Sequence, residues 1–463
     1  MFKSFAELER VLLSFHAKLG PIITIPFGSH SHVFIADHSL AHRALVQKGA
    51  IFSGRPPSHD GTNQNYISTA FYGHTWRILR RNLTAEILHP SRVKSYSHAR
   101  KWVLQNLLEL LKSQSRYGDP VHVMDHFLHS MLSLLALMCF GDKLEENQIK
   151  DIMATLRRVL MSFTRTSLLN ICPTFTRIIF RKQWEELLQA REHLEDILIP
   201  LIRQRKKFKE EKLSKGQQEQ HKDEYILSYV DTLLDLQLPE KKGNLDEKEI
   251  VDLCSEFLNG GTDSTSTALQ WIMANLVKYP HIQEKLFLEI KEVMGDSEDV
   301  IKEDDLQKMS YLKAVVLEGL RRHSPGKFSF PRAVLEDVIL DGYVVPKNGT
   351  VNFMIGQMAM DPKVWENPMA FVPERFLSSD INDGKVFDIT GSGEIKMMPF
   401  GAGRRICPGL GLAMLNLEYF VANLVWFFEW KIVDRVDVDL EEKHEFTVVM
   451  KNPLLAHVCP RLR

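Results

Sequence analysis

Residues 400–409 read Phe-Gly-Ala-Gly-Arg-Arg-Ile-Cys-Pro-Gly, and the apolar residues 410–415 that follow predict the start of a helix. A cysteine just before a helix lies among free backbone N–H groups at the positive end of the helix dipole, which favours a thiolate. Gly401, Gly403 and Gly409 can adopt positive φ, so the backbone can wrap closely around the sulfur and a flat ligand. The two arginines can hold carboxylates on that ligand.

Two simpler explanations of this stretch are a buried structural cysteine and a phosphate-binding glycine loop. A phosphate loop usually follows a strand and carries Lys-Ser or Lys-Thr, which this stretch lacks. The stretch also matches the pattern F-x-x-G-x-R-x-C-x-G at Phe400, Gly403, Arg405, Cys407 and Gly409. It resembles the haem-binding loop of the cytochrome P450 family, in which the cysteine thiolate is the axial iron ligand. The resemblance implies that Cys407 binds the metal and that Phe400, Gly401 and Arg405 help to bind the cofactor.

Composition describes an ordinary globular protein of 463 residues, with 44% hydrophobic residues and a formal net charge of -1. No global basic excess suggests nucleic acid as a partner. The five cysteines are scattered without a CxxC pair, which argues against a disulfide scaffold or a zinc site. We find no Pro/Gly/Ser-rich linker and no internal repeat, so we expect residues 1–463 to form one domain.

The sequence offers no apolar run near the ~18–20 residues needed to cross a bilayer, and no signal peptide is evident. A helical apolar stripe over residues 5–19 is expected to pack against the body of the protein. Its alternative is a peripheral contact with a membrane surface.

A predicted helix after residue 73 places Trp76 and Arg80 on one face, because they are four residues apart. A Trp N–H and a guanidinium can together bind one carboxylate, although a packed Trp beside a solvated Arg is the simpler explanation. The pair resembles the W-x-x-x-R motif of the family, which binds a haem propionate. Arg332, after Pro331, resembles a second propionate-binding arginine.

The longest predicted helix begins at Asn244, with Glu247 completing a capping box, and ends at Pro280. Its middle, residues 260–267, reads Gly-Gly-Thr-Asp-Ser-Thr-Ser-Thr. Two glycines inside a helix cost about 1 kcal/mol each relative to alanine, and the hydroxyl residues compete for backbone hydrogen bonds. Such a break of local rules marks either a functional site or a close helix crossing.

The same residues resemble the family pattern [A/G]-G-x-[D/E]-T-[T/S], in which the acid and the following alcohol line the oxygen pocket and deliver protons. Asp263 takes the position of the acid, and Ser264 takes that of the alcohol, where Thr is usual. Serine keeps the hydroxyl but loses the methyl group that helps to fix the rotamer. Thr265 can supply a second hydroxyl.

Glu318 and Arg321 are three residues apart on a predicted helix over residues 310–323. Alone, such a pair is most simply a surface salt bridge, worth under ~1 kcal/mol. It resembles the E-x-x-R motif of the family, and residues 373–376 resemble its P-E-R-F motif. The resemblance implies a buried structural triad of Glu318, Arg321 and Arg375.

The remaining patterns predict a hairpin over residues 22–36, a buried core helix over 127–140, a helix over 409–430, and strands over 333–340, 343–346 and 431–462. With the resemblance, they imply a mainly α fold with a smaller β-rich lobe. The substrate pocket is expected to include parts of residues 55–73, 170–180, 257–265, 327–330 and 446–450.

The implied activity is monooxygenation by haem b with O2 as co-substrate. We find no flavin or nicotinamide fingerprint in the chain, so electrons are expected from a separate NADPH–cytochrome P450 reductase. The substrate is expected to be a small, moderately hydrophobic molecule, and the protein a monomer. Two alternatives remain open at this point: a haem-thiolate isomerase or dehydratase, and a non-catalytic haem protein.

The details look most like the plant microsomal members of the A type, which lie on the cytosolic face of the endoplasmic reticulum membrane. Those members begin with a membrane anchor and a proline-rich hinge ahead of the first helix. This chain starts at that helix, so we expect the anchor to be absent from these 463 residues.

Overall fold

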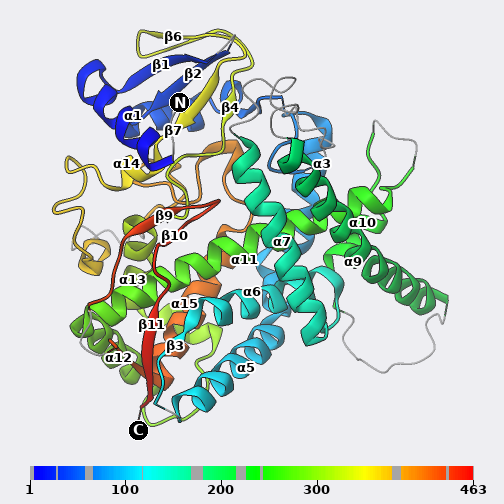
Figure 1. Ribbon diagram of the computed structural model, residues 1–463, viewed down its shortest axis with the longest axis vertical. Helices are drawn as coiled ribbons and strands as arrows, with labels where there is room; N and C mark the ends of the chain where they lie inside the picture. Colours follow the sequence, from blue (N-terminus) through cyan, green and yellow to red (C-terminus); the bar gives the residue numbers. More distant parts are fainter. Residues whose placement is uncertain are drawn as a thin grey trace.

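The computed structural model describes residues 5–27, 30–57, 66–116, 118–167, 181–214, 226–239, 243–377, 387–433 and 437–461. The fold is mainly helical with a smaller strand content, as predicted. Helix α11 (Glu247–Lys278) crosses the middle of the molecule (Figure 1) and packs most extensively against α6 (Val123–Phe140). It also packs against α15 (Leu410–Phe427), the helix that follows the cysteine loop.

The other α-helices surround this centre. They are α1 (Phe5–Leu19), α2 (His38–His42), α3 (His74–Asn82), α4 (Pro90–Ser95), α5 (Ser97–Ser115), α7 (Glu146–Ser167), α9 (Arg181–Ser214), α10 (Tyr229–Leu234), α12 (Pro280–Met294), α13 (Ser310–Arg322) and α14 (Ile355–Ala359).

The start of α11 differs from the prediction. The cap is Asp246, which exchanges side-chain to backbone hydrogen bonds with Glu249, whereas Asn244 donates its side-chain amide to the Leu234 carbonyl. The sequence holds two overlapping capping frames two residues apart. With Asp246 as the cap, the buried residues Leu245 and Ile250 occupy the two positions of a hydrophobic staple. This apolar pair favours Asp246 over Asn244 as the cap.

Most strands lie in two small sheets. The first has the order β1-β2-β7-β4, from β1 (Ile22–Phe27), β2 (His30–Ile35), β7 (Thr350–Phe353) and β4 (Arg332–Ala333). The second has the order β3-β11-β8, from β3 (Val121–His122), β11 (Leu455–Pro460) and β8 (Phe428–Lys431). Two further antiparallel pairs are β5 (Val338–Leu340) with β6 (Tyr343–Val345), and β9 (Glu442–His444) with β10 (Val448–Met450).

The hairpin predicted over residues 22–36 is confirmed as β1 and β2. The strand predicted over 333–340 is divided into β4 and β5. The helix predicted over 409–430 ends at Phe427, because the next residues alternate in burial and pair as β8.

Helices α6 and α15 are long and apolar enough to cross a membrane by length and composition. The sequence analysis had found no run close to that length. However, 78% of the α6 window and 61% of the α15 window lie buried inside the protein. Both are therefore core helices here, which confirms the interior helix predicted over residues 127–140.

Candidate functional site

The cysteine loop precedes α15, with a single 3-10 turn at Gly403–Arg405. The Cys407 N–H donates to the Phe400 carbonyl at 2.9 Å, which closes the loop. Gly401 and Gly403 both have φ of 68°, whereas Gly409 has φ of -86° and does not use the positive-φ freedom of glycine. A Cβ at Gly403 would collide with the Leu45 carbonyl, whereas a Cβ at Gly401 would meet nothing within 4 Å. The loop thus needs glycine at 403 and borders open space at 401.

The Cys407 thiol experiences opposing electrostatic effects. Burial raises its pKa, whereas the Gly409 backbone N–H and the Arg80 charge lower it. The predicted stabilisation of a thiolate by the following helix is present, but burial outweighs it in the ligand-free protein. A cation bound at the sulfur would supply the missing positive charge, because a thiol that coordinates a metal is deprotonated.

Four arginines from different parts of the chain gather near this loop, and we call them the arginine cluster: Arg55, Arg80, Arg332 and Arg405. Arg55, Arg332 and Arg405 are buried, and Arg80 on α3 is half-buried. Burial, together with the neighbouring arginine charges, lowers the pKa of Arg332 to about 9 and that of Arg405 to about 10. The cluster therefore holds more positive charge than its surroundings neutralise.

The donors of this cluster are used unevenly. Arg405 donates to the carbonyls of Ser53, Ile67 and Ala70, and Arg80 donates to the Ile406 carbonyl. The Trp76 Nε1–H also donates to the Ile67 carbonyl, at 3.0 Å. By contrast, the buried Arg332 Nε has no hydrogen-bond partner among the described residues.

These features satisfy the requirements of a haem. A thiol is available as an iron ligand, the open space at Gly401 leaves room beside the loop, and the orphan donor of Arg332 needs an anion. A buried charge without a partner is costly, and two propionates would neutralise two of the four guanidinium groups. The residues present therefore fit the cofactor.

The centre of α11 has two kinds of glycine. A Cβ at Gly261 would lie 2.7 Å from Leu135 of α6, so this glycine permits a close helix crossing. A Cβ at Gly260 would meet nothing within 4 Å, so this glycine borders open space. The two explanations offered for glycine inside this helix therefore both apply. Gly261 allows the close helix crossing, and Gly260 borders the candidate functional site.

Beside them, the Thr447 hydroxyl donates to Asp263 Oδ2 at 2.7 Å, and the Ser264 hydroxyl donates to the Gly260 carbonyl at 2.7 Å. Burial raises the pKa of Asp263, whereas the Thr447 hydrogen bond and the Arg157 charge lower it. Thr265 is buried. The acid and the alcohol thus have fixed partners, and Asp263 has an environment that eases its protonation.

The structure brings Glu318, Arg321 and Arg375 together. The Arg321 Nε and Nη2 donate to the two Glu318 oxygens at 2.7 and 2.8 Å, and Arg375 Nε reaches Glu318 at 3.3 Å. Glu318 and Arg321 are fully buried. The remaining Arg321 donors reach the carbonyls of Ala359, Pro368 and Ala370, so this guanidinium is fully used inside the protein.

Sequence reasoning did not place Glu256 in the site, and it gave no individual role to Arg55 and Thr447, which lie in the expected pocket segments 55–73 and 446–450. Their partners are remote in sequence, and no local spacing reveals them. Of the expected pocket, residues 58–65 and 170–180 lie outside the described residues. The Phe330 and Phe446 rings, from two other expected pocket segments, lie 6.2 Å apart and are partly exposed.

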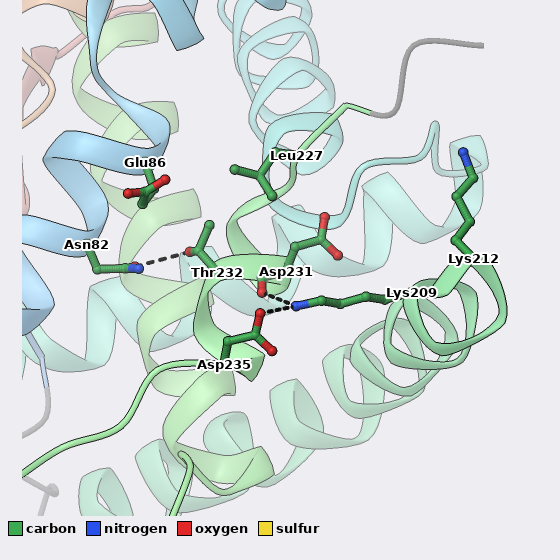
Figure 2. Close-up of a pocket in the computed structure, with 8 residues that line it drawn as sticks. All are labelled: Asn82, Glu86, Lys209, Lys212, Leu227, Asp231, Thr232 and Asp235. Carbon is green, nitrogen blue, oxygen red and sulfur yellow. Dashed lines mark hydrogen bonds and ion pairs between the residues drawn. The ribbon is translucent and has the colours of Figure 1, made fainter. Parts of the chain in front are cut away.

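A hollow of about 510 Å³ lies elsewhere, between α9, α10 and the residues that follow α3 (Figure 2). Its lining is Asn82, Glu86, Lys209, Lys212, Leu227, Asp231, Thr232 and Asp235. Figure 2 shows that Lys209 binds the Asp231 carbonyl and the Asp235 carboxylate, and that Thr232 binds Asn82. None of the predicted cofactor-binding residues lines this hollow, so we do not assign it to the haem.

A helical fold with one thiol at an arginine-rich loop is the architecture of a haem-thiolate protein. The family model "Cytochrome P450" matches residues 2–460. Cytochrome P450 89A9 of Arabidopsis thaliana is 47% identical over 99% of this chain and 90% of its own length. Costunolide synthase of Cichorium intybus is 28% identical over 96% of this chain and 87% of its own length. The chain belongs to the cytochrome P450 family.

A zebra fish cytochrome P450 solved with progesterone has the same fold, with a TM-score of 0.79 and 20% identity over 98% of this chain and 99% of that chain. Family membership and the plant relatives make the protein a cytochrome P450 monooxygenase. Such an enzyme works with haem iron, O2, a small-molecule substrate and a redox partner.

Proposed function

We propose that the protein inserts one atom of O2 into a small, moderately hydrophobic organic substrate, with electrons from NADPH delivered by a separate NADPH–cytochrome P450 reductase. The single observation that carries the site assignment is the buried, unpartnered Arg332 beside the cysteine loop. A separate reductase is supported by the sequence, in which we find no flavin or nicotinamide fingerprint. A relative such as geranylhydroquinone 3''-hydroxylase of Arnebia euchroma supports an organic substrate of this class.

In this proposal residues 1–463 form one haem domain, and haem b supplies the oxygen chemistry when bound. Cys407 ligates the iron, while Phe400 and Gly401 border the ring. Arg332 and Arg80 bind the propionates. Trp76 and Arg405 belong to the same binding region, although their donors to Ile67 suggest that they also fix the surrounding chain.

Asp263, Ser264 and Thr265 handle protons in this proposal. Burial raises the pKa of Asp263, so its carboxyl can hold a proton at Oδ1 while Oδ2 accepts the Thr447 hydroxyl. The Ser264 hydroxyl, anchored to the Gly260 carbonyl, can accept that proton and pass on its own. The Phe330 and Phe446 rings, which lie in two expected pocket segments, are exposed and 6.2 Å apart, and they favour a hydrophobic substrate.

The redox partner is proposed to dock on the cysteine side, where Arg81 and Lys396 are exposed. Reversal of both charges should slow reduction by the reductase, and an unchanged reduction rate would argue against this surface. Family resemblance favours a monomer on the cytosolic face of the endoplasmic reticulum membrane. Localisation of the protein in plant cells would test that part.

The test of the site is the ferrous–CO difference spectrum of the purified protein, of Cys407→Ser, and of Cys459→Ser as a matched control at a partly exposed free thiol. We expect a thiolate-type Soret band in the wild type and in the control, and its loss in Cys407→Ser. A band that survives in Cys407→Ser would contradict the ligand assignment. Product formation that requires both NADPH and reductase would then test the reaction.

A further inference from the structure

The segment Tyr66–Ala70 lies between α11 and the cysteine loop. On the α11 side, Glu256 accepts the backbone N–H groups of Ile67 and Ser68, one on each carboxylate oxygen, both at 2.6 Å. One turn earlier, Asp252 accepts the Tyr66 hydroxyl at 2.8 Å. Hydrogen bonds to a charged acceptor are the stronger kind, so α11 holds this segment firmly.

The opposite side of the segment is held by cations and by a tryptophan. The Ile67 carbonyl accepts Arg405 Nη1 at 3.1 Å and Trp76 Nε1 at 3.0 Å. The Ala70 carbonyl accepts Arg405 Nη2 at 2.7 Å. Arg405 therefore touches the segment twice, and it stands two residues before Cys407.

One peptide unit joins the two sides. The Ile67 carbonyl and the Ser68 N–H belong to the same peptide bond, so this unit accepts from the Arg405 guanidinium and donates to the Glu256 carboxylate. Hydrogen bonds in such a chain polarise one another, and each becomes stronger because the other is present. Glu256 and Arg405 are thereby linked through one rigid peptide plane without a hydrogen bond between them.

We propose that Glu256 is a positioning residue that fixes the Ile67–Ser68 peptide and, through it, orients Arg405 and the loop that carries Cys407. The inference rests on the proposed haem site. It adds Glu256, which acts on that site only through the Ile67–Ser68 peptide and Arg405. Both Glu256 oxygens are directed at backbone donors, which gives the side chain a role without substrate contact. Burial raises the pKa of Glu256 while these N–H groups lower it, as expected for an acid held by its hydrogen bonds.

The first test is Glu256→Gln, with Glu247→Gln as a matched control. Glu247 lies on the same helix, but its carboxylate pairs with an exposed Arg203. A glutamine at 256 keeps one acceptor and turns an N–H group toward a backbone N–H. Amide hydrogen exchange of residues 66–71 and haem transfer from the holoprotein to apomyoglobin are measured for each protein. We expect both to accelerate at least about tenfold in Glu256→Gln, the ratio for about 1.4 kcal/mol, and neither in the control.

The second test is a double-mutant cycle with Arg405→Lys, which keeps the charge but loses the fork of donors. If the peptide links the two residues, the double variant releases haem about as fast as the faster single variant. Fold-changes that multiply would overturn the link, because a general loss of stability gives independent effects. Should Arg405→Lys fail to retain haem, Trp76→Phe removes the other donor to the same carbonyl and serves in the cycle.

The two proposals fail in different ways. A wild-type protein without a thiolate-type ferrous–CO band would overturn the haem assignment, yet the exchange of residues 66–71 would still report on Glu256. A normal band with unchanged exchange in Glu256→Gln would overturn the positioning role alone.

Discussion

Two groups of arginines, the Glu318–Arg321–Arg375 triad and the arginine cluster beside Cys407, differ in how their buried charge is neutralised. In the triad, Arg321 meets both oxygens of Glu318 and three further carbonyls, and Glu318 and Arg321 are fully buried while Arg375 is partly buried. In the arginine cluster beside Cys407, four guanidinium groups gather, and Arg332 Nε has no partner among the described residues. The triad pairs its charges and hydrogen-bond donors within the protein, so it belongs to the scaffold. The arginine cluster leaves charge and a donor unpaired, so it is suited to bind an anionic ligand.

Glu318→Gln should have the largest effect on stability. It leaves the fully buried charge of Arg321, and the partly buried charge of Arg375, without their carboxylate, and the expected loss is about 3–5 kcal/mol in the free energy of unfolding. Urea unfolding of the haem-free protein measures it. Glu374→Gln is the control, because Glu374 pairs with Lys285 at a half-exposed position and should change stability by less than about 1 kcal/mol. A similar small loss in both variants would remove the contrast between the two arginine groups.

His323 offers a third solution for a buried basic side chain, which is to stay neutral. It stacks on Trp271 with ring centroids 3.9 Å apart, and Lys327, Arg322 and Glu442 surround it. Burial is the main cause that lowers its pKa from 6.5 to about 4. A lowered folded-state pKa gives stability that is complete above pH 6.5 and is lost as the pH falls toward 4.

Between pH 7 and pH 5, His323 should therefore cost the wild type about 2 kcal/mol of unfolding free energy. His323→Phe keeps the stacking and should lose that part of the pH dependence. Urea unfolding at the two pH values measures the difference. Equal pH dependence in both proteins would mean that His323 carries a charge in the folded state.

Of the three variants, Arg332→Met should change the free energy of unfolding least, while it weakens haem binding. Removal of an unpaired buried charge should leave the unfolding free energy of the haem-free protein within about 1 kcal/mol or raise it. Haem transfer to apomyoglobin should accelerate at least about tenfold, since one propionate partner is gone. A stability loss as large as that of Glu318→Gln would instead make Arg332 part of the scaffold.

Features with a fixed local spacing could be predicted from the sequence, whereas contacts between remote residues could not. The triad and the cysteine loop carry fixed local spacings, such as Glu318 with Arg321 and Phe400 with Cys407, and these were visible in the sequence. The contact of Glu256 with Ile67 spans 189 residues, and no periodicity reports it. Arg55 lies in the expected pocket segment 55–73, but its contacts could not be predicted, because its carbonyl partners at Phe330 and Pro331 lie 275 and 276 residues away.

Element boundaries failed where two local signals competed. The capping frames of Asn244 and Asp246 overlap, and tertiary burial of Leu245 and Ile250 selects the second. Phe428 and Trp430 follow the apolar run of α15 with only Glu429 between them, so their pairing with β11 distinguishes strand from helix. Of the three glycines that can adopt a positive φ, only Gly401 and Gly403 do so, and these two turns bring the chain to the helix.

The strand order of both sheets has a consequence for biosynthesis. Strand β2 finds its parallel partner β7, and β3 finds its partner β11, only after about three hundred further residues have been made. A nascent chain that ends at residue 340 has made β2 and β3, but β7 and β11, with which they pair, are still to be synthesised. Open edges of this kind can pair with other chains, so incomplete chains of this protein should be prone to aggregation until these long-range partners have been made.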